Sequence, residues 1–238
     1  MNELTLHPVG RIHSPFREKF GIPRQPGLIP DVRMRLELLP PWDVPEAVTG
    51  LEEFSHVWLI FGFHAVARGQ ARPTVRPPRL GGNRRIGVFA SRSTHRPNPL
   101  GLSVVALEEV RLVSGRAELW LRGGDLLDGT PVFDIKPYLP WAESLPDARG
   151  GFAAAPPERS PVVLAEAAEE ALARDAELAA LRKLIVDVVA WDPRPAYRAG
   201  ATDERVYGVR IGAHDIHFRA QGDTLCILDI VPGESAHE

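Results

Sequence analysis

The stretch VRMRLEL, residues 32–38, decides the fold class, because apolar and polar side chains alternate along it with a period of two. This period is the mark of a β-strand with one buried face. The next strong segment, HVWLIFGF at residues 56–63, is a nearly continuous apolar run rich in β-branched and aromatic residues. Together the two segments favour a β-sheet structure in the first half of the chain.

Further short strands are predicted outward from these two, each bounded by Gly and Pro: residues 86–90, 102–107, 117–121 and 132–135. Many short strands without long helices are typical of a barrel or sandwich. We therefore expect a mainly β fold, with an antiparallel β-barrel over residues 1–145. No G-x-G-x-x-G turn is present, which argues against a dinucleotide-binding Rossmann fold.

The composition changes after the barrel region, where Asp, Gly, Ala and Pro dominate. This change predicts a linker over residues 146–159. Apolar residues at helical spacing then predict a helix over 165–190, and three strands follow at 205–211, 215–220 and 224–231. Residues 160–238 are thus expected to form a small α+β C-terminal domain.

Composition also bears on the cellular setting. The chain of 238 residues has a single cysteine, so no disulfide framework is expected. Its first residues lack the apolar run of a signal peptide, and no stretch approaches the roughly 20 apolar residues that span a bilayer. A cytoplasmic protein with no membrane contact is the expectation.

Positive charge is concentrated in one segment. Residues 54–107 hold eight arginines and no Asp or Glu, although the whole chain carries a net charge of −3. Such a local field attracts polyanions, and arginine suits phosphate binding and base stacking. An anionic ligand, RNA foremost, is the favoured interpretation; a solvated surface is the alternative.

Two proline-rich segments suggest ligand loops. FGIPRQPG, residues 20–27, holds Arg24 and Gln25 between prolines, either as a preorganised ligand loop or as a rigid connector. In the segment 77–101, Arg92 ends a predicted strand, whereas Arg96 and Asn98 lie on a proline-locked turn. Asn98 is suited to reading a base edge, or to local hydrogen bonds alone.

Two further segments carry ionisable groups. In DLLDGTPVFDIKPY, residues 125–138, Asp134 and Lys136 share one face of a strand, either as a surface ion pair or as acid–base machinery. In DPRPAYR, residues 192–198, a tyrosine beside an arginine suits stacking on a nucleobase. The histidines lack metal-ligand spacing, so no metal site is expected.

Four blocks of the chain resemble the TsaA-like family, also called TrmO, and the resemblance runs from about Val9 to Pro232. They are EKFGIPRQPG, RPTVRPPRLGGNRRIGVFASRSTHRPNPLG, DLLDGTPVFDIKPYLP and DPRPAYR. The resemblance implies a tRNA methyltransferase that uses S-adenosyl-L-methionine to methylate N6 of threonylcarbamoyl-adenosine next to the anticodon. It also implies a cofactor-binding β-barrel, a small C-terminal domain, a homodimer and a tRNA anticodon stem-loop as partner.

The resemblance also implies site residues. Cofactor contacts are expected at Pro23, Arg24, Gln25, His64, Ala65, Arg92, Leu102, Asp125, Leu126, Leu127 and Asp128. The family commonly has Gln where this chain has Ala65, so only a backbone contact is expected there. By the same resemblance, RNA contacts are expected at Arg96, Asn98, Arg194 and Tyr197. Arg84 and Arg85 are added as expected RNA contacts because they belong to the arginine-rich segment.

Methylation of an acylated adenine amine calls for a base. Asp134 is the first candidate and Asp128 the second, with Lys136 beside Asp134 in the catalytic group. A non-enzymatic RNA-binding module that uses the arginine-rich face is the alternative function. A phosphate-ester hydrolase is disfavoured, because its metal-ligand spacing is missing.

Overall fold

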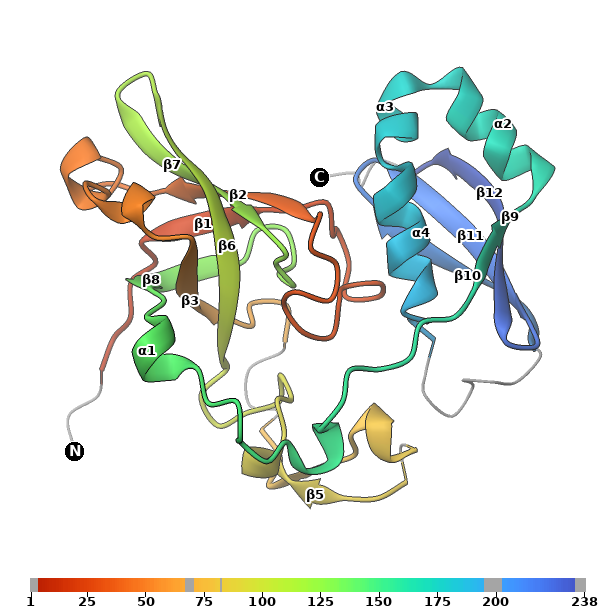
Figure 1. Ribbon diagram of the computed structural model, residues 1–238, viewed down its shortest axis with the longest axis horizontal. Coiled ribbons are helices and arrows are strands. Elements are labelled where there is room, and N and C mark those ends of the chain that lie inside the picture. The colour runs from red at the N-terminus through yellow and green to blue at the C-terminus, as the bar shows by residue number, and fades with distance from the viewer. Residues whose placement is uncertain (1–3, 67–70, 82, 195–202, 234–238) are drawn as a thin grey trace.

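The computed structural model describes residues 4–66, 71–81, 83–194 and 203–233. Figure 1 shows a β-barrel on the left, an α+β unit on the right and a turn-rich segment below them. Tyr197 lies outside the described residues.

Six strands close the barrel, in the order β1-β2-β7-β6-β3-β8, and every neighbouring pair is antiparallel. This arrangement confirms the expected antiparallel barrel. The strands are β1 (Gly10–His13), β2 (Arg33–Leu38), β3 (His56–Gly62), β6 (Leu100–Val113), β7 (Arg116–Arg122) and β8 (Pro131–Pro137).

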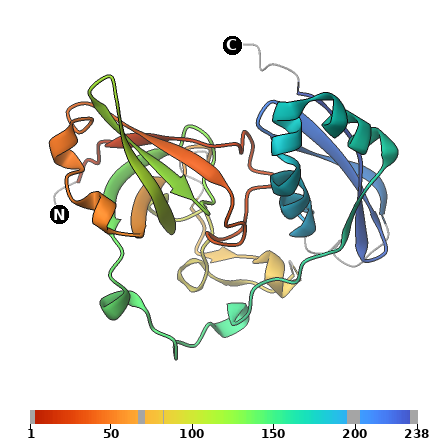
Figure 2. The same ribbon diagram turned by 45° about the horizontal axis from the view of Figure 1, so that its top comes forward.

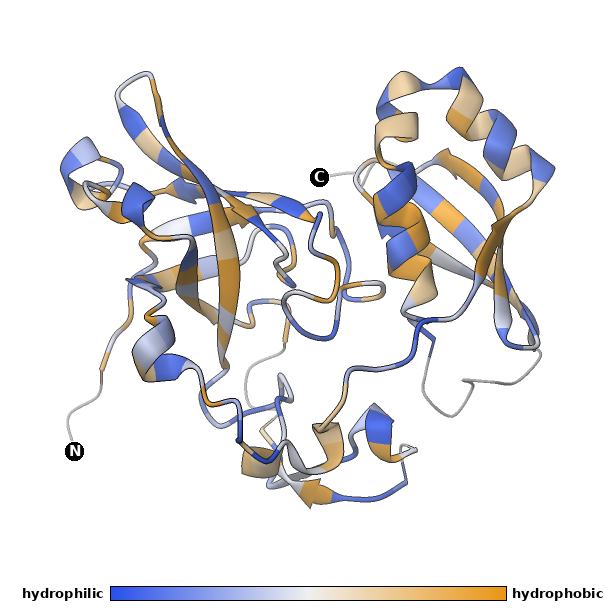
Figure 3. Ribbon diagram, viewed as in Figure 1, coloured by the Kyte–Doolittle hydropathy of each residue, from blue (hydrophilic) through white to orange (hydrophobic). Residues whose placement is uncertain are grey.

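Alternation explains why these strands form. In β2, Met34, Leu36 and Leu38 are buried, whereas the arginines and the glutamate between them reach the outside. The same period of two buries alternate residues of β3 and β7. Figure 3 shows the resulting change between hydrophobic and hydrophilic residues along the strands.

The predicted strand at 86–90 is shorter than expected. β5 spans only Ile86–Gly87, pairs with β4 (Thr74–Val75) and is followed by a 3₁₀ turn at Val88–Ala90. β6, in contrast, extends well beyond the predicted 102–107, because its far end pairs with β7 outside the apolar core.

The chain leaves the barrel between β3 and β6 to form an excursion, residues 71–81 and 83–99. The excursion contains β4, β5 and two 3₁₀ turns, at Pro78–Leu80 and Val88–Ala90. It lies below the barrel in Figures 1 and 2 and carries most of the arginine-rich segment. The positive charge is therefore displayed beside one end of the barrel.

The C-terminal unit is a four-stranded sheet with helices on one face (Figure 1). Its strand order is β10-β11-β12-β9, and β9 runs parallel to β12. The elements are β9 (Val162–Leu164), α2 (Glu166–Arg174), α3 (Ala176–Ala180), α4 (Arg182–Ala190), β10 (Asp203–Ile211), β11 (His214–Gln221) and β12 (Thr224–Pro232).

The single helix predicted over 165–190 is wrong, because three helices replace it. Asp175 has extended backbone angles, and its carboxylate accepts hydrogen bonds from the backbone N–H groups of Glu177 and Leu178. Asp is a preferred N-cap residue, so its side chain starts α3, while the extended backbone of the same residue ends α2. The apolar spacing predicted the buried face but gave no sign of this break.

A strap joins the barrel to the C-terminal unit and includes α1 (Pro140–Glu143) and a 3₁₀ turn at Gly151–Ala153. It passes beneath the molecule in Figure 2. Arg79 of the excursion donates a hydrogen bond to the Ala155 carbonyl, with an N···O distance of 2.6 Å. The expected linker, 146–159, falls within this strap, and its role as a domain boundary stays a prediction.

No helix in the described part of the chain is long and apolar enough to cross a membrane.

Candidate active site

A cavity of about 780 Å³ opens at the end of the barrel nearest the excursion. Four segments far apart in the sequence supply its walls: the proline-rich loop after β1, the ends of β3 and β6, the excursion and the turn before β8. Three of the four blocks singled out in the sequence thus meet at one place.

Ten of the eleven residues expected to contact a cofactor line this cavity. They are Pro23, Arg24, Gln25, His64, Ala65, Arg92, Leu102, Asp125, Leu126 and Leu127. Asp128 is the exception.

Asp125 supplies a carboxylate to the wall. Its Oδ1 accepts a hydrogen bond from the Ser103 hydroxyl at 2.7 Å. Burial raises the pKa of Asp125 above its usual range, and the Ser103 hydrogen bond and the positive charge of Arg92 oppose the rise. The cavity thus holds a carboxylate of increased basicity.

Arg92 ties two walls of the cavity together. Its Nη2 donates to the Leu102 carbonyl at 3.1 Å, and its Nη1 donates to the side chain of Gln25. Arg96 is held in turn by the carbonyl of Ser91, at 2.8 Å. The side chains of Arg92 and Arg96 are thus held at the edge of the cavity. Together with Lys19 and Arg24, they give it a positively charged rim.

Asp128 acts as a brace outside the cavity lining. Its Oδ1 accepts from the Ser14 N–H at 2.8 Å, and its other oxygen pairs with Arg17. The carboxylate therefore anchors the start of the proline-rich loop to the turn before β8.

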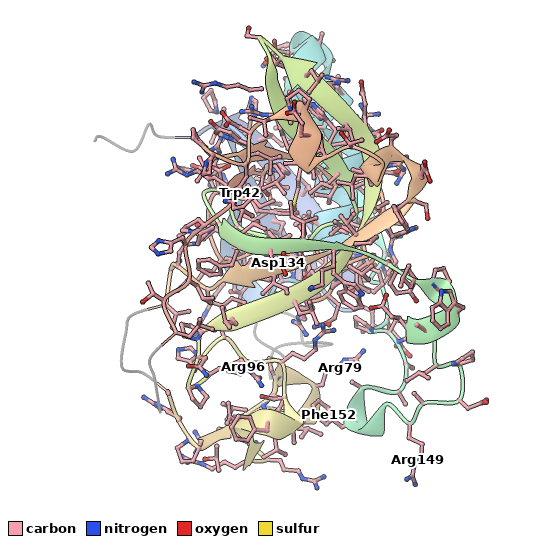
Figure 4. The ribbon with its side chains drawn as sticks, turned by 90° about the vertical axis from the view of Figure 1, so that its left-hand side faces the viewer. Trp42, Arg79, Arg96, Asp134, Arg149 and Phe152 are labelled. Carbon is pink, nitrogen blue, oxygen red and sulfur yellow. The ribbon has the colours of Figure 1, made fainter. Side chains whose placement is uncertain are left out.

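Asp134 and Lys136 share one face of β8, as their spacing predicts, and form an ion pair with an N···O distance of 3.6 Å. Their side chains are 51% and 63% exposed, respectively, and neither residue lines the cavity. Figure 4 shows Asp134 on β8, separate from the Arg96 and Arg79 side chains below it. An exposed pair of this kind contributes little to stability, about 0–1 kcal/mol.

The residues expected to contact RNA fall into different environments. Arg84, Arg85 and Asn98 are exposed on the excursion, and Arg96 lines the cavity. Arg194 is only 2% exposed, and its guanidinium bonds both carboxylate oxygens of Asp192 at 2.8 Å. Arg194 therefore presents no free guanidinium to a phosphate, and we assign it a packing role.

Sequence reasoning missed several lining residues, among them Lys19, Phe61 and Ser103. Ser103 carried a usable signal, since it is a polar residue at an inward position of an apolar strand and is 2% exposed. Phe61 carried none, because a buried aromatic residue in a barrel strand is ordinarily part of the core.

Among the described residues, no three His, Cys, Asp or Glu side chains lie together as a potential metal site.

Comparison with known families gives two matches that together span most of the chain. Residues 11–144 match the tRNA-methyltransferase O N-terminal domain, and residues 157–233 match the TrmO C-terminal domain.

Two relatives match over nearly their whole length. A putative S-adenosylmethionine-dependent methyltransferase, RcsF, of Pseudomonas aeruginosa is 50% identical, with coverage of 97% of this chain and 99% of the relative. The tRNA (adenine(37)-N6)-methyltransferase of Escherichia coli is 48% identical, with coverage of 92% and 93%, respectively.

A solved structure agrees with this assignment. The crystal structure of TrmO from Pseudomonas aeruginosa superposes with a TM-score of 0.79 and 43% identity, with coverage of 97% of this chain and 99% of that one. The chain belongs to the TrmO family.

Proposed function

We propose that this protein is an S-adenosyl-L-methionine-dependent tRNA methyltransferase that acts on N6 of the adenosine at position 37. The relative from Escherichia coli carries that name and matches 92% of this chain. The observation that carries the proposal is the cavity, because ten residues expected to hold the cofactor line it.

The cavity suits the cofactor in size and chemistry. Its volume of about 780 Å³ lies within the range of ordinary ligand sites. Ile60, Phe61, Leu102 and Leu126 offer apolar surface for a nucleoside, and Asp125 offers a carboxylate to a cationic ligand. When bound, the cofactor supplies an electrophilic methyl group.

The chain itself has three tasks in such a transfer. It must hold the acceptor nitrogen in line with the methyl group, because correct proximity and orientation lower the barrier to transfer. It must exclude water, for which the apolar wall is suited. Following the family resemblance, we propose threonylcarbamoyl-adenosine as the acceptor, and its acylated N6 must also lose a proton to a base.

Asp125 is our first candidate for the proton acceptor, ahead of Asp134 and Asp128. It is the one carboxylate among the described residues that line the cavity, and its raised pKa suits a base. Asp134 lies on β8 outside the lining, and Asp128 is occupied by Ser14 and Arg17.

The positive rim of the cavity suits the anionic parts of the substrate. Arg24, Arg92 and Arg96 line the cavity. We propose that they receive the threonyl carboxylate or neighbouring phosphates, because guanidinium groups bind both in a bidentate manner. We also propose that Arg84 and Arg85 bind RNA and that the RNA partner is the tRNA anticodon stem-loop. We further propose that the protein works as a homodimer in the cytoplasm.

Binding of S-adenosylhomocysteine, measured by titration calorimetry, separates this proposal from a non-enzymatic RNA-binding module. If the proposal is right, the protein binds the compound at one site per chain. Arg92→Ala should weaken this binding, because it removes the bonds to Gln25 and Leu102. An RNA clamp has no use for the compound, so an absence of measurable binding by the parent protein overturns the proposal.

A further inference from the structure

One wall of the cavity lies between the two halves of the molecule. Residues 15–28 run from the barrel toward the C-terminal unit and back, as the loops between them in Figure 1 show. On the barrel side, Gly27 N–H donates to the Gly123 carbonyl at 2.8 Å. On the other side, Gly212 N–H donates to the Pro15 carbonyl at 2.7 Å, and Phe20 stacks on Phe218 with ring centroids 6.5 Å apart.

Trp191, at the end of α4, contacts this wall directly. Its indole N–H donates to the Leu28 carbonyl at 3.1 Å, across 163 positions of sequence. Arg159 covers the indole ring, with its guanidinium carbon 5.5 Å from the ring centroid. The tryptophan is thereby fixed in position, and its hydrogen bond reaches the far end of the loop that carries Pro23, Arg24 and Gln25.

The turn after Trp191 contacts the same loop. Nη2 of Arg24 approaches the carbonyl oxygens of Asp192 and Arg194, at 3.3 and 3.4 Å. The bidentate pair between Arg194 and Asp192 holds these two carbonyls in place, in a turn where Asp192 has a φ of 43°. The buried Arg194 thus shapes an acceptor site for an arginine of the cavity wall.

The fit between loop and C-terminal unit leaves no room at Gly21. This residue has a φ of +90°, and a Cβ atom there would lie 2.1 Å from the Cγ2 of Val209 in β10. The loop therefore packs on the sheet of the C-terminal unit as closely as a backbone allows.

We propose that the C-terminal unit positions the cofactor loop, with Trp191 as the main positioning residue. The inference rests on the proposed function, in which the cavity binds S-adenosyl-L-methionine. The barrel contacts the loop near its far end, where Gly27 bonds Gly123. The C-terminal unit contacts the middle of the loop at Arg24, through the turn at 192–194, and its far end at Leu28, through Trp191. Cofactor affinity then depends on residues that touch no cofactor.

The test compares Trp191→Phe with Trp120→Phe in the full-length protein. Phenylalanine keeps an aromatic ring but removes the indole N–H. Trp120 is the matched control, because its indole N–H donates to Glu118 at 3.0 Å on β7, away from the cavity. Three experiments are made on each variant: calorimetry gives the Kd for S-adenosylhomocysteine, amide hydrogen exchange is followed at residues 21–28 in the ligand-free protein, and turnover gives KM and kcat.

Trp191→Phe is expected to raise the Kd by about 2- to 12-fold, the range for loss of one hydrogen bond. Exchange should become faster at residues 21–28 and stay unchanged in the barrel strands. In turnover, the KM for the cofactor should rise while kcat at saturating cofactor stays within about twofold of the parent. Arg194→Lys, which removes the bidentate brace, should act in the same direction.

Parent-like Kd values together with parent-like exchange at residues 21–28, in both Trp191→Phe and Arg194→Lys, overturn the inference. An equal weakening in Trp120→Phe also overturns it, because the effect would then not come from the loop. If the parent protein itself does not bind S-adenosylhomocysteine, the proposed function fails instead, and the exchange measurement still decides whether Trp191 holds the loop.

Discussion

At the scale of single residues, Ser103 and Asp125 control the charge inside the cavity. The Ser103 hydrogen bond lowers the pKa of Asp125, while burial raises it. Ser103→Ala removes the lowering contribution, so the carboxylate should protonate at a higher pH than in the parent. We predict that the acid limb of the kcat/KM profile moves to higher pH. Ser55→Ala is the control, because this serine is exposed and its hydroxyl bonds the His56 ring rather than a cavity residue, so the variant should leave the limb in place.

Asp125→Asn and Asp134→Asn separate the two candidates for the base. Under single-turnover conditions with saturating tRNA and cofactor, a lost base typically costs about 10²- to 10⁴-fold in rate. We predict a loss of this size for Asp125→Asn and a rate within a few-fold of the parent for Asp134→Asn, because the latter belongs to an exposed ion pair. The opposite ranking would restore Asp134 as the base.

Asp125→Asn should also change stability, with a sign that follows from its pKa. A carboxyl group whose pKa is raised by folding binds more protons in the folded state, so stability falls as pH rises through the folded pKa. A neutral asparagine escapes this penalty. The Tm of Asp125→Asn should therefore exceed that of the parent at neutral pH, and the difference should shrink as the pH is lowered.

At the scale of elements, the close approach of β3 and β6 shapes the cavity. A Cβ atom at Gly101 would lie 2.3 Å from the Phe61 ring, and Phe61 lines the cavity. We predict that Gly101→Ala costs about 1–3 kcal/mol in unfolding free energy and weakens S-adenosylhomocysteine binding, because the ring must move. Gly87→Ala has nothing within 4 Å of the added methyl group and should be near neutral on both counts. Chemical denaturation and calorimetry check the pair.

The elements also differ in how well the sequence predicted them. Alternation in residues 32–38 and a β-rich apolar run in residues 56–63 predicted two barrel strands, because both patterns are local to the segment. β1 escaped prediction, since GRIH has only four residues and half of them are polar. The sequence singled out four segments one by one, and three of them line a single cavity in the structure. The hydrogen bond between Trp191 and Leu28 could not be predicted, because it depends on how two units pack.

At the scale of the whole molecule, the arginine-rich excursion lies beside the cavity and should determine how tRNA binds. Each phosphate that an arginine neutralises adds roughly 0.7 to 0.9 to the slope of log affinity against log salt concentration. Arg84 and Arg85 are exposed on the excursion. We predict that the double replacement Arg84→Ala with Arg85→Ala flattens this slope. An unchanged slope would show that these two arginines face away from the RNA.

The central claim is that the barrel transfers a methyl group from S-adenosyl-L-methionine to N6 of adenosine 37 of tRNA. Its most direct test is incubation of the protein with methyl-labelled cofactor and tRNA, with and without the threonylcarbamoyl group, followed by digestion and identification of the labelled nucleoside. The account predicts label on N6 of the threonylcarbamoyl-adenosine at position 37, and loss of that label with Arg92→Ala. Label at another nucleoside, or transfer that persists unchanged in Arg92→Ala, would contradict it.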